Sequence, residues 1–136
     1  MAVTYAVENI MSVNIVTVES RASLYEAVRL MVDKGIGSVI ATRDGEIKGI
    51  LTERDVLKKL SSDNSFATAL VEEVMSIPLI TIEGHAPIGQ AADLMAEKKV
   101  RRLLVTLEDR IQGIVTERDV MRATLYVFKT LADATV

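Results

Sequence analysis

Apolar residues along the chain form strand-like runs followed by stretches with helical spacing, and this order occurs twice. Short runs rich in β-branched residues, at 14–18 and 79–82, predict strands. Each run is followed by apolar residues three and four positions apart, a spacing that predicts the buried face of a helix. These residues are Leu24, Ala27, Val28 and Met31 in the first copy and Ile88, Ala91, Ala92 and Met95 in the second.

Local signals place the ends of these elements. Ser23 and Glu26 form a Ser-x-x-Glu capping box, and Pro87 suits a first helical turn. Two further apolar runs in each copy, joined by a short polar turn, predict a hairpin. These runs are 38–42 with 47–51 and 102–106 with 111–115. Thr52 and Thr116 then offer hydroxyls that can cap a closing helix.

The two copies are an internal duplication. Residues 49–55 reappear, with one substitution, as 113–119, and the offset of 64 aligns 7–57 with 71–121 without a gap. Each copy opens with a short helical turn, at 7–11 or 71–75. We therefore predict one unit at 1–64 with a core at 7–60, and a second at 65–136 with a core at 71–124 and a C-terminal helix extension. The polar stretch 61–65 is the predicted linker.

Each predicted unit runs strand, helix, strand, strand, helix. Such a unit covers only one face of a small sheet with helices, so the bare faces of the two sheets should pack together with pseudo-twofold symmetry. The predicted fold class is α+β, an α/β sandwich-like pair. The last helix continues through Met121, Tyr126, Phe128 and Leu131 with more apolar surface than one face can bury, which predicts a homodimer contact.

Composition narrows the classes of function. The chain has 136 residues and is 49% hydrophobic, enough for a substantial core. It has no cysteine, which excludes thiolate metal sites and cysteine nucleophiles, and its one histidine, His85, leaves no cluster for zinc or for a Ser-His pair. We therefore expect no enzyme, catalytic cofactor or metal. A net charge of −3 with 4% aromatic residues disfavours nucleic acid. Without an apolar span or leader pattern, the expected location is the cytoplasm.

The repeated Thr-x-x-Asp carries the candidate chemistry. Thr52 with Asp55, and Thr116 with Asp119, place a hydroxyl and a carboxylate at the start of a helix, beside unpaired backbone N–H groups. A carboxylate can accept both hydrogen bonds of a sugar diol, and the hydroxyl and N–H groups can donate to phosphate. Gly49 and Gly113, three residues upstream, would let a ligand approach closely. The alternative is a capping box that serves stability alone.

These residues resemble the CBS (cystathionine-β-synthase) domain family, and the chain is similar to a stand-alone pair, or Bateman module, over 7–122. The resemblance rests on residues 71–76, residues 99–105 and both Gly-x-x-Thr-x-x-Asp segments. It implies a regulatory, non-catalytic module that binds AMP, ADP or ATP in two clefts between the halves, usually as a dimer, and that acts on an unidentified regulated protein. S-adenosylmethionine is a further ligand of the family.

The resemblance also implies which residues line the clefts. Apolar residues of the opening strands would hold the base, namely Ile15 and Val16 or Leu79 and Ile80. Phosphate donors at the second strand would come from the partner half, so Arg101 and Arg102 would serve the cleft of Thr52 and Asp55. The cleft of Thr116 and Asp119 would have only Gly37 and Ser38 there, and would be weaker, empty or suited to less charge.

Two other classes of function stay open from the sequence. One is a structural or protein-interaction dimer whose clefts stay empty and whose Thr-x-x-Asp segments only cap helices. The other is a nucleic-acid binding module that uses local basic pairs such as Arg101 and Arg102. Such a module would show a steep dependence on salt, which the acidic composition argues against.

Overall fold

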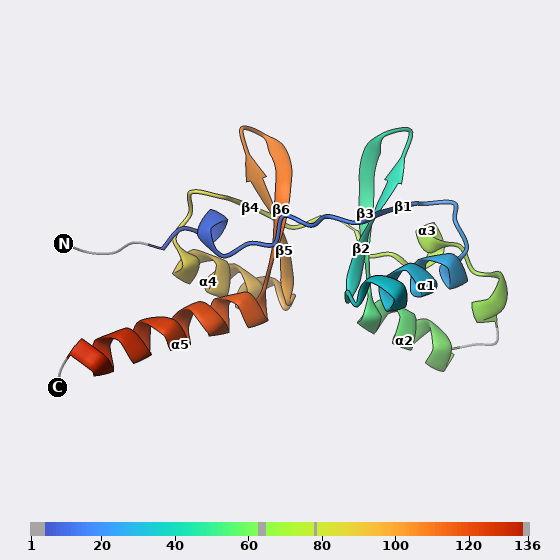
Figure 1. Cartoon of the computed structure of the whole chain (residues 1–136). Helices are drawn as coiled ribbons and strands as arrows, with labels where there is room; N and C mark the ends of the chain where they lie inside the picture. Colours follow the sequence, from blue (N-terminus) through green and yellow to red (C-terminus); the bar gives the residue numbers. More distant parts are fainter. Residues whose placement is uncertain (1–4, 63–64, 78, 135–136) are drawn as a thin grey trace. The chain divides into compact units, whose positions relative to one another are not determined.

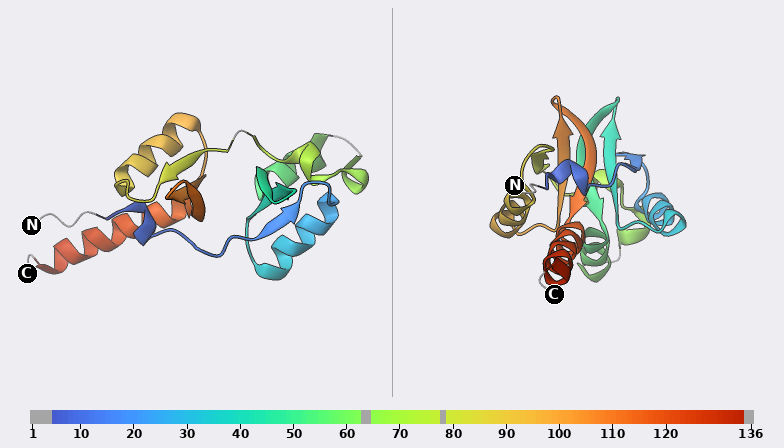
Figure 2. Two further views of the ribbon diagram at one scale, coloured as in Figure 1. Left: turned by 90° about the horizontal axis from the view of Figure 1, so that it is seen from above. Right: turned by 60° about the vertical axis from the view of Figure 1, so that its left-hand side comes forward.

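A computed structural model describes residues 5–62, 65–77 and 79–134 of the chain (Figure 1). The chain divides into two compact units. One is Ile15–Leu79, here called the first unit, and the other combines Met1–Asn14 with Ile80–Val136, here called the second unit. In each unit two long helices lie on the same face of a small sheet, as Figure 1 and Figure 2 show.

The first unit contains a three-stranded sheet in the order β1-β2-β3. Strand β1 runs parallel to β2, and β2 and β3 form an antiparallel hairpin. The elements are β1 (Thr17–Glu19), α1 (Leu24–Lys34), β2 (Ser38–Arg43), β3 (Glu46–Thr52), α2 (Glu53–Ser62), the 3-10 helix η2 (Ser65–Thr68) and α3 (Val71–Val74).

The second unit repeats this arrangement, with sheet order β4-β5-β6. The β4–β5 pair is parallel and the β5–β6 pair antiparallel. Its elements are the 3-10 helix η1 (Val7–Asn9), β4 (Thr81–Glu83), α4 (Ile88–Lys98), β5 (Arg102–Leu107), β6 (Arg110–Thr116) and α5 (Glu117–Ala134). The predicted order of strand, helix, strand, strand, helix and the predicted mixed α/β class are confirmed in both units.

Several predicted boundaries are wrong. The opening strands are shorter than predicted, because β1 pairs with β2 only from Thr17 and β4 pairs with β5 only from Thr81. Pro87 is the N-cap of α4, one position before the first turn. The predicted linker begins inside α2, which extends to Ser62, and its residues 63 and 64 lie outside the described residues.

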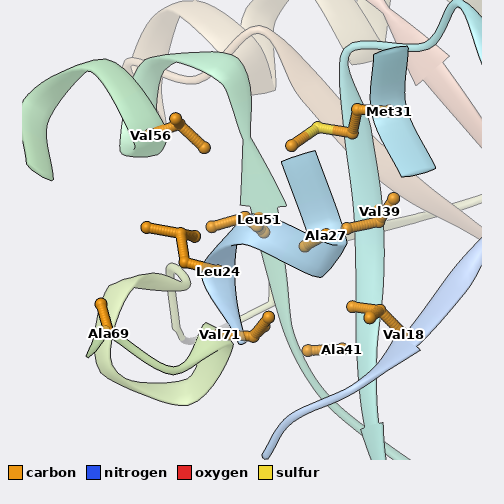
Figure 3. Packing of buried hydrophobic residues seen from close by; sticks show 10 residues of the cluster. All are labelled: Val18, Leu24, Ala27, Met31, Val39, Ala41, Leu51, Val56, Ala69 and Val71. Atoms are coloured by element: carbon orange, nitrogen blue, oxygen red, sulfur yellow. The ribbon is translucent and has the colours of Figure 1, made fainter. Parts of the chain in front are cut away.

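The core of each unit lies between its sheet and its helices. In the first unit, Leu24, Ala27 and Met31 of α1 pack with strand residues and with Val56 of α2 (Figure 3). The strand residues are Val18, Val39, Ala41 and Leu51. The second unit has the same pattern, with Ala91 and Met95 of α4 against Ile82, Leu103, Val105 and Val115. These positions belong to the predicted helical faces, with two exceptions in α4. Ala92 is exposed, and Ile88 is half-buried and lies outside the core cluster.

Each core is completed by a segment that belongs, in the repeat alignment, to the other copy. Val7 donates its amide to Ala86 O at 2.8 Å and is fully buried in the second unit. Its counterpart Val71 donates to Ala22 O at 2.9 Å and is fully buried in the first unit. The units defined by contacts therefore exchange these segments relative to the repeat, whereas the predicted division at 64/65 follows the sequence alignment.

The exchanged segments, which include residues 7–12 and 71–76, explain why two strand positions are glycine. A Cβ atom on Gly113 would lie 2.5 Å from Met11 Sδ and 2.7 Å from Ser12 O, and one on Gly49 would lie 2.7 Å from Met75 Sδ and 3.0 Å from Ser76 O. The two glycines are buried. The expectation that their missing side chains admit a ligand is therefore wrong, because the chain itself occupies that space.

Helix α5 leaves a large apolar surface exposed. Its exposed residues include Met121, Leu125, Tyr126, Phe128 and Leu131. The predicted surplus of apolar surface on the last helix is thus present, and a dimer contact there stays a prediction. Within the described part of the chain, no helix has the length and apolarity to cross a membrane.

The close approach at Gly113 makes a testable prediction. Gly113→Ala should lower the free energy of unfolding by about 1–3 kcal/mol, because a backbone carbonyl must move to admit the methyl group. Urea unfolding followed by circular dichroism measures this change. Gly89→Ala is the control: nothing lies within 4 Å of its Cβ position in α4. That helical site should gain up to about 1 kcal/mol from alanine. Equal stability of the two variants would contradict the packing role of Gly113.

Candidate functional site

The Thr-x-x-Asp segment of the first unit forms a capping box at the start of α2. Asp55 Oδ2 accepts hydrogen bonds from the Thr52 amide at 2.9 Å and from Thr52 Oγ1 at 3.0 Å. The Asp55 amide in turn donates to Thr52 Oγ1 at 3.3 Å. Both residues are half-buried. The capping bonds are thus present, and the Thr52 hydroxyl, which was expected to donate to phosphate, donates to Asp55.

The second unit has a similar but less closed arrangement at the start of α5. Asp119 Oδ2 accepts from the Thr116 amide at 2.9 Å, and the Asp119 amide donates to Thr116 Oγ1 at 3.1 Å. Among the described residues, no acceptor receives the hydroxyl hydrogen of Thr116, and no donor reaches Asp119 Oδ1. The capping bonds of the second unit therefore engage fewer of these groups than those of the first unit.

Ser76, which the sequence analysis did not select, accounts for a further difference between the two units. Ser76 Oγ donates to Asp55 Oδ1 at 2.9 Å. Its counterpart in the repeat, Ser12, instead accepts the Asn14 amide at 3.4 Å through its hydroxyl oxygen. The signal that could have identified both serines is their common place directly after Met11 and Met75, at the repeat offset.

Few backbone N–H groups at the two helix starts are available to an anion. The Glu53 amide donates to Gly37 O at 3.1 Å, and the Glu117 amide donates to Arg101 O at 2.9 Å. The third amide of each helix donates to the capping threonine. Of the first three amides, those of Arg54 and Arg118 have no acceptor among the described residues. Each helix thus offers one free amide there rather than the full set that the sequence suggested.

The second strand of each unit brings its predicted residues beside the capping threonine. Ser38 lies opposite Thr52, and Arg102 lies opposite Thr116. Arg101 precedes that pair, and its Nε lies 3.9 Å from Glu117 Oε2 in an exposed ion pair that adds little stability. Because the arginines belong to the other unit from Thr52 and Asp55, their predicted role at that site stays a prediction.

The four predicted base-slot residues differ in their surroundings. Val16 and Ile80 are half-buried and pack against the cores of their own units. Their carbonyls are also engaged, accepting the Ile40 amide at 2.9 Å and the Leu104 amide at 3.0 Å. Ile15 and Leu79 are half-buried and belong to neither core cluster. These two side chains are therefore the better candidates for contact with a base.

The second unit also has a shallow hollow of about 340 Å³ away from these residues. It is lined mainly by apolar groups of α4, α5 and the N-terminal segment, including Tyr5, Ile88, Val127 and Phe128. None of the predicted ligand-binding residues lines it. Among the described residues, no cluster of three or more His, Asp or Glu side chains could hold a metal ion.

Comparison with known proteins gives the family of the chain. The family model described as CBS domain matches residues 7–62 and again residues 71–126. Among curated proteins, the chain is similar to CBS domain-containing protein YhcV of Bacillus subtilis strain 168. The two are 29% identical over 114 residues, which cover 84% of this chain and 81% of that protein.

Solved structures give the same result for the fold. The CBS-domain containing protein ATU1752 of Agrobacterium tumefaciens matches with a TM-score of 0.83 and 26% identity, covering 88% of this chain and 99% of that one. The CBS domain pair of protein MJ0100, solved in complex with 5′-methylthioadenosine and S-adenosyl-L-methionine, matches with a TM-score of 0.79 and 26% identity, covering 93% and 98%. With both repeats matched by the family model and the fold shared with these pairs, the chain belongs to the CBS-domain family and carries two CBS domains.

Proposed function

We propose that this chain is a non-catalytic regulatory module that binds adenosine-containing ligands through Asp55 and Asp119. The observation that carries the proposal is the duplicated, half-buried carboxylate held at the start of α2 and α5 within a CBS pair. A fixed carboxylate beside open solvent is suited to the two hydroxyls of a ribose. Each hydroxyl donates one hydrogen bond, and an ionised carboxylate offers about four acceptor positions.

The remaining parts of the ligand have candidate partners among the residues of the two units. The free amides of Arg54 and Arg118 can donate to phosphate, and so can the Thr116 hydroxyl. Ile15 and Leu79 offer apolar surface for the base. Arg101 and Arg102 supply positive charge, and a charge-assisted hydrogen bond to phosphate is about twice as strong as a neutral one. We propose AMP, ADP or ATP as the ligand on this basis.

S-adenosylmethionine or 5′-methylthioadenosine is the second candidate ligand. The observation in its favour is the MJ0100 pair, which is solved in complex with both compounds. These ligands share the ribose diol with the nucleotides but carry no phosphate. They therefore require Asp55 or Asp119. 5′-Methylthioadenosine has no anionic group and does not require Arg101 or Arg102, whereas the carboxylate of S-adenosylmethionine can pair with them. Nucleotides and 5′-methylthioadenosine are therefore distinguished by how binding responds to removal of the arginines.

The structural alternative is a dimer whose carboxylates only cap helices. The capping bonds seen in both units are compatible with it, and they are equally compatible with binding, because Asp119 Oδ1 has no donor among the described residues. Exposed Leu125 and Phe128 on α5 support a contact between two copies of the chain under either proposal. Dimerisation, cytoplasmic location and an unidentified regulated protein remain parts of the proposal.

Ligand binding should raise the melting temperature of the protein. A ligand present at about 100 times its dissociation constant stabilises the native state by about 2.7 kcal/mol. We expect this shift with AMP, ADP or ATP, measured by differential scanning calorimetry, and we include S-adenosylmethionine and 5′-methylthioadenosine in the panel. The absence of any shift or binding heat across the panel would exclude the proposed function and favour the structural dimer.

The carboxylates can be tested separately from the fold. Asp55→Ala together with Asp119→Ala should abolish the ligand-induced shift, while each lost cap lowers the stability of the free protein by about 0.5–2 kcal/mol. Ser23→Ala is the matched control, because Ser23 caps α1 by accepting the Glu26 amide at 3.1 Å away from the proposed sites. That variant should lose similar stability and keep the full shift. A shift that survives in the double aspartate variant would show that the carboxylates do not hold the ligand.

A further inference from the structure

The two carboxylates differ in how many of their acceptor positions the chain already fills. Asp55 accepts three hydrogen bonds, from the Thr52 amide, Thr52 Oγ1 and Ser76 Oγ, at 2.9, 3.0 and 2.9 Å. Among the residues that the structure describes, the only donor to Asp119 is the Thr116 amide, at 2.9 Å. Of about four acceptor positions on an ionised carboxylate, these bonds leave one at Asp55 and three at Asp119. A diol needs two.

The sequence differs beside the two serines in a way that bears on the orientation of their hydroxyls. Ser12 Oγ is turned toward the backbone, where it accepts the Asn14 amide at 3.4 Å. The residue at the equivalent position of the second repeat is Pro78, and proline has no amide hydrogen to donate. Ser76 therefore has no such amide to hold its oxygen toward the local backbone, and its hydroxyl donates to Asp55.

We propose that Ser76 is a positioning residue that competes with the ligand's ribose for Asp55, and that no equivalent competitor acts at Asp119. The inference rests on the proposed function. A ligand with two neighbouring hydroxyls can engage Asp55 fully only after Ser76 Oγ has been displaced, whereas a ligand with one hydroxyl can use the open position directly. Ser76 thus lowers the affinity of Asp55 for a diol and offsets any ligand affinity that Arg101 and Arg102 contribute there.

Full-chain variants with one carboxylate each test the proposal by isothermal titration calorimetry. Asp119→Ala leaves only the Asp55 site, and Ser76→Ala is added to it. We expect AMP to bind the double variant about tenfold more tightly than the single one, a factor equivalent to about 1.4 kcal/mol or one net hydrogen bond. The gain should vanish with 2′-deoxy-AMP, which has a single ribose hydroxyl. A merely structural role of Ser76 would not distinguish the two ligands.

Matched variants keep the result interpretable. Ser12→Ala added to Asp55→Ala should leave AMP affinity unchanged, since Ser12 has no bond to Asp119 among the described residues. Ser76→Thr retains a hydroxyl and should restore the weaker binding. Asp119→Leu, whose side chain has no hydrogen-bond acceptor, replaces Asp119→Ala if thermal melts show that the alanine variant is unfolded.

The outcomes separate the two proposals. If wild-type protein binds no adenosine compound, the proposed function fails and this inference fails with it. If the wild type binds AMP and Ser76→Ala leaves the affinity unchanged, lowers it, or changes AMP and 2′-deoxy-AMP equally, only the inference is overturned. Binding by the wild type that is lost in both Asp119 variants would show that Asp55 takes no diol, which also overturns the inference.

Discussion

Two pairs of backbone hydrogen bonds hold the exchanged segments in place, and much of the structure depends on them. Ser76 and Ile50 exchange bonds of 2.8 and 3.2 Å, and Ser12 and Ile114 exchange bonds of 2.8 and 2.9 Å. These bonds bring one chain segment against β3 and another against β6, so close that the neighbouring strand position must be glycine. They also bring Ser76 to the carboxylate of Asp55, so that one backbone contact shapes both the core and the candidate site.

Much of the fold could be predicted because its signals are local. The spacing of Leu24, Ala27 and Met31 gave the buried face of α1, and the apolar runs on either side of short turns gave both hairpins. The short parallel strands were less predictable. Their ends depend on where β1 meets β2 and β4 meets β5, and the β-branched content of residues 14–16 carries no information about that pairing.

The candidate site was predictable in its residue types and less so in their bonding. The Thr-x-x-Asp pattern predicted a hydroxyl and a carboxylate at each helix start, and the structure has them there. It did not predict that Thr52 and Ser76 both donate to Asp55, because the contact with Ser76 spans 21 residues and comes from a segment outside the aligned first repeat. Gly49 and Gly113 were misread for the same reason, since the atoms that crowd them come from Met75 and Met11.

The exchange of segments also bears on how such a protein could have arisen. A polypeptide with one repeat would carry its own helical turn but would have no second turn to cover its strand, so residues equivalent to Val71 and Ala69 would be missing from its core. The equivalent turn of a second molecule could supply those residues. In the duplicated chain the turn comes from the same polypeptide, so the core of each unit contains residues from both repeats.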